Sequence, residues 1–276
     1  MPLKIIAAFA AFTSLCLAAP ALAGFPEGKA ALDRGDYATA YRELRPAAEQ
    51  GNARAAAYVA DMLWNGRGVS SDRESALSWY RKAIAQGDSF AQFNLAYILS
   101  RGDGIARDPA QAAALFSKGA ERGEPDAQYQ LARMLYLADG VPHDPVRAAY
   151  LARKSAASGY QLAQILLGGA YYDGSGVVQN KQIAATLYWV AVDNTAPLNG
   201  SQQQIAEGRA EAQRNFDTTS QYLTQQQVSD AVAMADDIER TGQLDTIIAA
   251  FERKVALAYG RPPSTAPRST PARRTS

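Results

Sequence analysis

Cysteine and histidine are almost missing from this chain. Its 276 residues hold one of each, Cys16 and His143. Most zinc and copper sites are built from several residues of these two types, so no transition-metal centre is expected. His143 fits a surface turn, and Cys16 lies in the N-terminal segment that we expect to be removed. The sequence therefore predicts no metal, no other cofactor and no thiol chemistry.

An excess of charge of either sign is also missing. The chain carries 28 basic and 27 acidic residues, which gives a formal net charge of +1. A nucleic-acid-binding domain usually shows a strongly basic stripe or patch. Residues 260–276 hold four arginines and no acid, but these are dispersed among prolines and give only weak attraction. We therefore expect no nucleic-acid partner.

Long apolar runs are scarce, and the clearest one lies at the start of the chain. Lys4 precedes an apolar stretch at 5–17, and residues 21–23 read Ala-Leu-Ala, a small-x-small cleavage signal. This pattern is typical of a secretory signal peptide, and the run is too short to span a membrane. We favour this interpretation over a retained anchor. The sequence predicts cleavage near Ala23, no stable membrane insertion, and a periplasmic or secreted protein.

What the chain does contain is a repeat of 36 residues. Residues 52–87 recur without insertion or deletion at 88–123 and 124–159, and a degenerate fourth copy occupies 160–195. Constant spacing of this kind indicates a repeat architecture. The apolar positions in register include Ala55, Ala91, Ala127 and Ala163, then Val59, Leu95, Leu131 and Leu167, and later Ala76, Ala112, Ala148 and Ala184.

Each copy predicts two helices joined by a glycine turn. In the first copy, Ala55, Val59 and Leu63 recur at helical spacing and form one apolar stripe. Glycine then ends the helix, because it adopts the left-handed conformation without steric cost. An aspartate or asparagine at a fixed offset predicts the N-cap of the second helix. The turns lie at 66–69, 102–105, 139–141 and 174–177, and the caps are Asp72, Asp108, Asp144 and Asn180.

These residues carry a resemblance to a known family. The pattern at 91–105, followed by Asp108, Ala112 and Lys118 before Gly123, resembles the Sel1-like repeat, a relative of the tetratricopeptide repeat. The resemblance implies an all-α fold, a right-handed α/α solenoid of helix pairs with helical caps at both ends. It also implies that the chain binds other proteins, and it does not imply a reaction.

The repeat fixes the expected domain organisation. Because a solenoid buries apolar surface only between neighbours, its end units must shield the open faces. We expect a signal peptide at 1–23, a degenerate N-terminal helix pair at 24–51, four repeats at 52–195, a C-terminal helical cap at 196–259 and a disordered tail at 260–276.

The candidate binding residues follow from the resemblance. In tetratricopeptide-like stacks the first helix of each pair lines a concave groove, and aromatic and arginine side chains dominate binding hot spots. An alternative is that some of these side chains fill the core, above all Trp64 and Tyr136. The predicted partner-binding residues are Arg54, Asp61, Trp64, Phe93, Tyr97, Arg101, Tyr129, Arg133, Tyr136 and Tyr172.

The predicted function is a non-enzymatic periplasmic adaptor or regulator that binds a segment of an envelope protein, such as the periplasmic domain of a sensor. The layout is similar to that of an exported Sel1-like regulator of exopolysaccharide synthesis in rhizobia, which suggests envelope signalling or exopolysaccharide production. One alternative is an enzyme of cell-wall or β-lactam chemistry, although the chain lacks the paired cysteines of those relatives and a Ser-x-x-Lys helix. The other alternative is a glycan-binding module that stacks sugars on the same aromatic groove.

Overall fold

The computed structural model describes residues 24–194 and 202–258, and their regular structure is entirely helical. The predicted signal peptide at 1–23 and the predicted tail at 260–276 lie outside the described residues. The chain forms two compact units, an N-terminal unit at 1–95 and a C-terminal unit at 96–276, and the boundary falls inside α5. Each unit is described by itself below.

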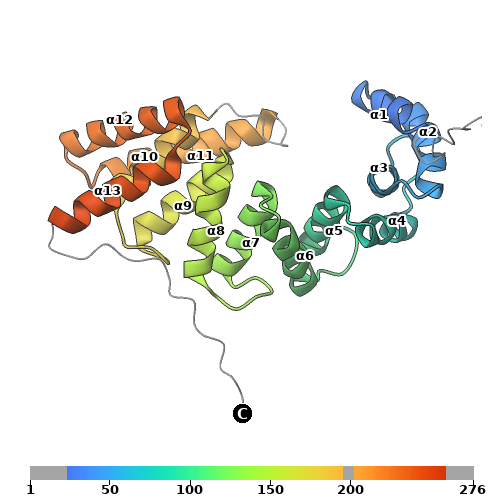
Figure 1. The fold of residues 1–276 in the computed structure, drawn as a ribbon, viewed down its shortest axis with the longest axis horizontal. Coiled ribbons are helices and arrows are strands. Elements are labelled where there is room, and N and C mark those ends of the chain that lie inside the picture. Colours follow the sequence, from blue (N-terminus) through green and yellow to red (C-terminus); the bar gives the residue numbers. More distant parts are fainter. Residues whose placement is uncertain (1–23, 195–201, 259–276) are drawn as a thin grey trace, which may run out of the picture. The chain divides into compact units, whose positions relative to one another are not determined.

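The helices form consecutive pairs in both units. In the N-terminal unit α1 packs against α2, α2 against α3 and α3 against α4; in the C-terminal unit the same chain of contacts runs from α6 to α10 (Figure 1). This packing confirms the predicted all-α solenoid of helix pairs. The helices of the pairs are α1 (Phe25–Asp33), α2 (Tyr37–Glu49), α3 (Ala53–Asn65), α4 (Arg73–Ala85), α5 (Ser89–Arg101), α6 (Pro109–Glu121), α7 (Pro125–Leu137), α8 (Pro145–Ala157), α9 (Gln161–Asp173) and α10 (Lys181–Asp193).

The second helix of each pair begins at the predicted cap. The Asp72 side chain accepts a hydrogen bond from the Ser75 backbone N–H at 3.0 Å, and this bond lowers the pKa of Asp72. Asp108 and Asp144 each accept from the N–H three residues ahead at 2.9 Å, and Asn180 does so at 3.0 Å. These bonds satisfy amides that have no partner inside the helix. The predicted caps are therefore confirmed.

The glycine turns have a second role that the sequence pattern did not reveal. The second glycine of the turn lies against the start of the second helix in the preceding pair. A Cβ atom at Gly68 would collide with the backbone carbonyl of Tyr37, and one at Gly176 would collide with that of Pro145. The turn therefore packs neighbouring pairs together as well as ending a helix.

The core is built from small and medium apolar residues at the repeat positions. Ala55, Val59, Ala132 and Leu167 are completely buried. Small side chains let neighbouring helices approach closely, which suits a stack of many short helices. The largest fully buried side chains are Tyr80, Tyr171 and Phe116.

Three helices follow the repeats: α11 (Gln202–Ser220), α12 (Gln225–Thr241) and α13 (Leu244–Ala258). Both α11 and α12 pack on α10, whereas α13 contacts α8 and α12 (Figure 1). Trp189 of α10 contacts Phe216 of α11, with ring centroids 4.8 Å apart, and the Thr186 hydroxyl donates to the Ala231 carbonyl of α12. The second helix of the fourth repeat is thus enclosed by later parts of the chain.

Candidate partner-binding surface

The first helices of the C-terminal unit approach one another along one side. Here α9 contacts both α7 and α11. The rings of Tyr129 and Tyr160 lie 5.2 Å apart, and the Tyr136 hydroxyl donates to a carboxylate oxygen of Asp173 at 3.5 Å. Because side chains of successive first helices touch directly, this side is the inner surface of the unit.

Five tyrosines lie on or just before the first helices of this unit, and we call them the tyrosine surface: Tyr97, Tyr129, Tyr136, Tyr160 and Tyr172. Tyr172 stands at one end of the set, where its ring contacts Tyr222, with centroids 6.2 Å apart. Each of the five side chains is half-buried. Such a set combines extended ring area with hydroxyl groups that donate and accept hydrogen bonds, which suits recognition of a polypeptide. Four of the five were predicted from the sequence.

Tyr160 was missed, although the repeat contains a signal for it. It lies in register with Asn52, Asp88 and Glu124, which precede the first helices of the other repeats. At Tyr160 no side-chain cap bond is formed, and the ring packs on Tyr129 instead. A large ring at the position where Asn52 and Asp88 cap their helices indicates that capping has given way to another role.

Burial and nearby carboxylates raise the pKa of two of these phenols, Tyr129 and Tyr160. Burial raises the pKa of Tyr129, Arg133 opposes this rise, and Glu211 of α11 adds to it. Burial also raises the pKa of Tyr160, with a further contribution from Asp126. At neutral pH the hydroxyl groups of Tyr129 and Tyr160 are therefore available as neutral hydrogen-bond donors.

The predicted arginines of this unit are held by neighbours. Arg101 pairs with Asp103 at 3.0 Å and stacks on Tyr97, with its guanidinium carbon 5.5 Å from the ring centroid. Arg133 donates from Nε to the side-chain oxygen of Gln130 at 3.3 Å. Both side chains are therefore oriented before any partner arrives, which reduces the entropy lost on binding.

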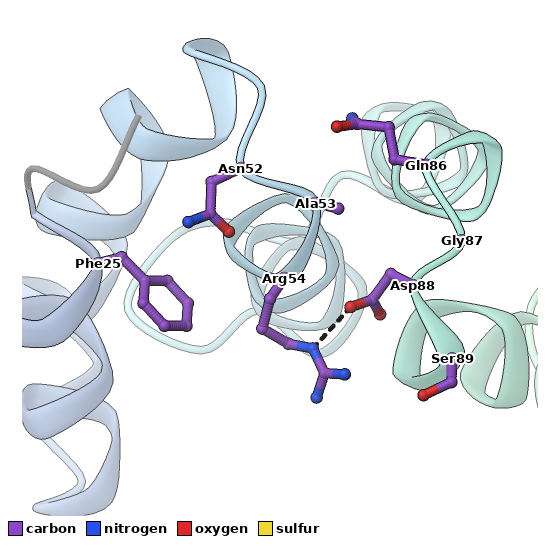
Figure 2. A pocket seen from close by; sticks show the side chains of 8 residues that line it. All are labelled: Phe25, Asn52, Ala53, Arg54, Gln86, Gly87, Asp88 and Ser89. Carbon is purple, nitrogen blue, oxygen red and sulfur yellow. Dashed lines mark hydrogen bonds and ion pairs between the residues drawn. The ribbon is translucent and has the colours of Figure 1, made fainter. Parts of the chain in front are cut away.

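Four predicted residues belong to the N-terminal unit, and one of them, Arg54, pairs with a buried carboxylate. Its Nε donates to Asp88 at 2.6 Å, and its guanidinium stacks on Phe90 at 5.6 Å. Figure 2 shows Arg54 directed toward Asp88, with Phe25 on its other side, at a shallow hollow of about 540 Å³. Phe93 is half-buried. The hollow is lined by Phe25, Asn52, Ala53, Arg54, Gln86, Gly87, Asp88 and Ser89.

Trp64 and Asp61 are more enclosed. Trp64 is only 9% exposed, and the Arg73 guanidinium covers its ring at 5.3 Å, so it offers little surface to a partner. Asp61 accepts a hydrogen bond from Asn65 at 2.9 Å and lies 3.6 Å from Arg67. Burial raises the pKa of Asp61 despite these two partners.

Six of the predicted residues thus lie in the C-terminal unit, where Arg101 stacks on Tyr97, and the other four belong to the N-terminal unit. Their role in binding stays a prediction. Within the described ranges, no three histidine, cysteine, aspartate or glutamate side chains cluster as a metal site would require. None of the helices in that part of the chain combines the length and apolar character needed to cross a membrane.

The repeats match a known family model, that of the Sel1 repeat, at residues 53–88, 89–124, 125–160 and 161–188. The chain carries four Sel1 repeats. Sel1-repeat proteins generally mediate protein–protein interactions and are typically non-catalytic. Among curated protein sequences, none matches this chain.

Two solved structures of similar proteins extend this Sel1-repeat assignment. A protective antigen present in uropathogenic Escherichia coli strains, which displays an SLR fold, is 29% identical with a TM-score of 0.70 and matches over 91% of this chain. The match covers 51% of that antigen, so this chain spans about half its length. A Sel1 repeat protein from Oxalobacter formigenes is 26% identical over 72% of this chain and 87% of its own, with a TM-score of 0.58.

Proposed function

We propose that this Sel1-repeat protein is a non-catalytic adaptor or regulator that binds an extended segment of another protein on its tyrosine surface. The observation that carries the proposal is the contact of Tyr129 with Tyr160 and of Tyr136 with Asp173 on the inner side of the C-terminal unit, with Tyr97 near enough to influence Tyr160 electrostatically. Rigid, half-buried rings give a large contact area at low entropic cost. The general role of Sel1 repeats in protein–protein interaction supports the same conclusion.

The proposal also includes a location and a class of partner. We propose that the protein is exported, works in the periplasm and binds an envelope protein or the periplasmic domain of a sensor. The pattern of residues 1–23 supports export. A role in envelope signalling or exopolysaccharide production is part of the same proposal, and it rests on the likeness of layout described for the sequence.

Crosslinking in intact cells tests the proposal. The wild-type chain and the variant Tyr97→Ala with Arg101→Ala would each be crosslinked, purified and identified with their partners by mass spectrometry. The matched control is Tyr41→Ala with Arg45→Ala, because Arg45 likewise stacks on a tyrosine four residues before it, Tyr41, and pairs with a nearby carboxylate, Glu49. We expect the first variant to lose a periplasmic partner that the control retains. Equal capture by all three proteins would show that the surface is misplaced.

The two alternatives give different results in simple assays. Retention of the purified chain on peptidoglycan or exopolysaccharide, with loss of retention in the Tyr97 variant, would favour a glycan-binding module. Hydrolysis of a chromogenic β-lactam by the purified chain would favour an enzyme. We expect neither result.

A further inference from the structure

The way in which α13 docks supplies a template for a second binding site. At the position where three repeats carry Leu63, Leu99 and Leu135, the fourth carries Tyr171. Tyr171 is 1% exposed, and its hydroxyl donates to Glu252 of α13 at 2.6 Å. The longer side chain thus reaches from the core to a carboxylate on the docked helix.

Two ion pairs also join α13 to α8. Arg153 of α8 lies 3.2 Å from Asp245 and 3.4 Å from Glu252, and these carboxylates stand seven residues apart on α13. Between them, Ile248 is completely buried. One flank of α8 therefore holds an amphipathic helix that presents two acids, two turns apart, around an apolar side chain.

A different face of α8 borders a cleft of about 360 Å³. Its floor includes Leu131 of α7 and Leu151 of α8, both buried, while Tyr150 is 53% exposed at its edge. The cleft runs between α6 and α8 and is lined by Ser117, Ala120, Glu121, Gly123, Gln128, Leu131, Arg147, Tyr150, Leu151 and Lys154. It is a partly apolar hollow that the described part of the chain leaves open.

Two cations border this cleft, and they are seven residues apart, the same separation as between Asp245 and Glu252 on α13. Arg147 and Lys154 are exposed, seven residues apart on α8, which corresponds to about 10 Å along the helix axis. The Lys154 amine lies over the Tyr150 ring, 5.3 Å from its centroid. The acid in the lining, Glu121, accepts a hydrogen bond from the Ser117 hydroxyl at 3.1 Å. The cleft therefore offers an apolar floor with a net positive rim.

We propose that this cleft binds an amphipathic helix of a second protein, which carries two carboxylates about two turns apart around a large apolar side chain. Its acids pair with Arg147 and Lys154, and its apolar side chain enters the hollow beside Tyr150. This is the helix-in-groove mode of recognition, with electrostatic complementarity that sets the register. The site lies apart from the tyrosine surface, so it does not rest on the function proposed above and would let the chain join two proteins.

The test uses the purified full chain and a fluorescent, helix-stabilised peptide with the sequence of residues 244–258, which contains the required pattern. We expect saturable binding in fluorescence anisotropy. Arg147→Glu with Lys154→Glu should weaken it by roughly tenfold or more, and so should replacement of both peptide acids by lysine. Arg81→Glu with Lys82→Glu, two exposed cations on α4, is the matched control and should leave the affinity within about twofold.

Two further measurements keep the outcome decisive. Circular dichroism melting of each variant shows whether it is folded, and Tyr150→Ala tests the cleft without a change of charge. Binding that is lost in Arg153→Ala but kept in the Arg147 and Lys154 variant would place the peptide in the α13 site and overturn the proposal. Absence of saturable binding to the wild-type chain would overturn it as well.

Discussion

Gln128 donates from Nε2 to the carbonyl oxygen of Ala120, 3.4 Å away across the turn between α6 and α7. Gln164 repeats this bond to Ala156 one period later, at 3.5 Å. Both glutamines are buried, at 5% and 3% exposure. A buried amide is tolerated when it is hydrogen-bonded, so these side chains link the second helix of one pair to the first helix of the next.

This relationship predicts the effect of replacing Gln128 by methionine, which keeps the volume but removes the donor. The free energy of unfolding should fall by about 1 kcal/mol, the net value of one such bond. Denaturant unfolding measures it. Gln225→Met, at an exposed position of α12, is the control and should change stability by less than about 0.5 kcal/mol. Equal effects at the two sites would mean that the bond contributes nothing specific.

Ala138 gives a prediction of the opposite sign. It ends α7 with φ of 56°, where α3 and α9 end in Gly66 and Gly174. A residue with a Cβ atom pays about 1–2 kcal/mol in this left-handed conformation, and glycine avoids most of that cost. Ala138→Gly should therefore raise the free energy of unfolding by about 0.5–1 kcal/mol. Ala114→Gly, on the exposed face of α6, should lower it by about 1 kcal/mol. A loss of stability in both variants would contradict the conformational argument.

Two glycines in different surroundings, Gly176 of the fourth turn and Gly87 after α4, predict a graded response to alanine. Gly176 and Gly87 both have positive φ, 76° and 83°, but a Cβ atom at Gly176 meets the Pro145 carbonyl whereas one at Gly87 meets open space. Gly87→Ala should cost about 1–2 kcal/mol from backbone strain alone. Gly176→Ala should cost at least about 1 kcal/mol more, because the turn must move off α8. Thermal and denaturant unfolding compare the two, and equal losses would show that the close approach is easily relieved.

Asp61 predicts a dependence of stability on pH. Burial raises its pKa in the folded chain, so the charged form is disfavoured by folding. The contribution of Asp61 to the free energy of unfolding therefore falls as pH rises from the pKa of the unfolded chain through the raised pKa of the folded chain. It is most unfavourable at neutral pH. Asp61→Asn keeps the acceptor for Asn65 and should be more stable than wild type at pH 7, with the difference shrinking as pH falls toward 4. Melting temperatures across this range measure it, with exposed Asp230→Asn as the control. A variant less stable at pH 7 would show that the Arg67 contact outweighs burial.

The sequence predicted those parts of the fold that depend on local spacing. Apolar periodicity located the helix pairs. The caps at Asp72 and Asp144 could be predicted because an Asx side chain accepts a hydrogen bond from the backbone N–H only three residues ahead. Contacts between repeats could not be predicted from local spacing. The residue that lies against Gly176, for example, is Pro145 of the preceding pair, and this contact depends on how the two helix pairs stack. For the same reason the packing of Tyr160 on Tyr129 could not be predicted, and the sequence left Trp64 open between groove and core, whereas in the structure Arg73 covers its ring.

The junction of Tyr171 with Glu252 restricts how this array can evolve. Solenoids commonly lengthen by duplication of a whole unit. A copy of the fourth repeat inserted before the original would carry a buried phenol with no acid from α13 to receive its hydroxyl, an arrangement that costs about 1–3 kcal/mol. New units should therefore arise from the leucine-bearing copies between residues 52 and 159, which leaves the last repeat as the fixed end of a stack that can grow only from within.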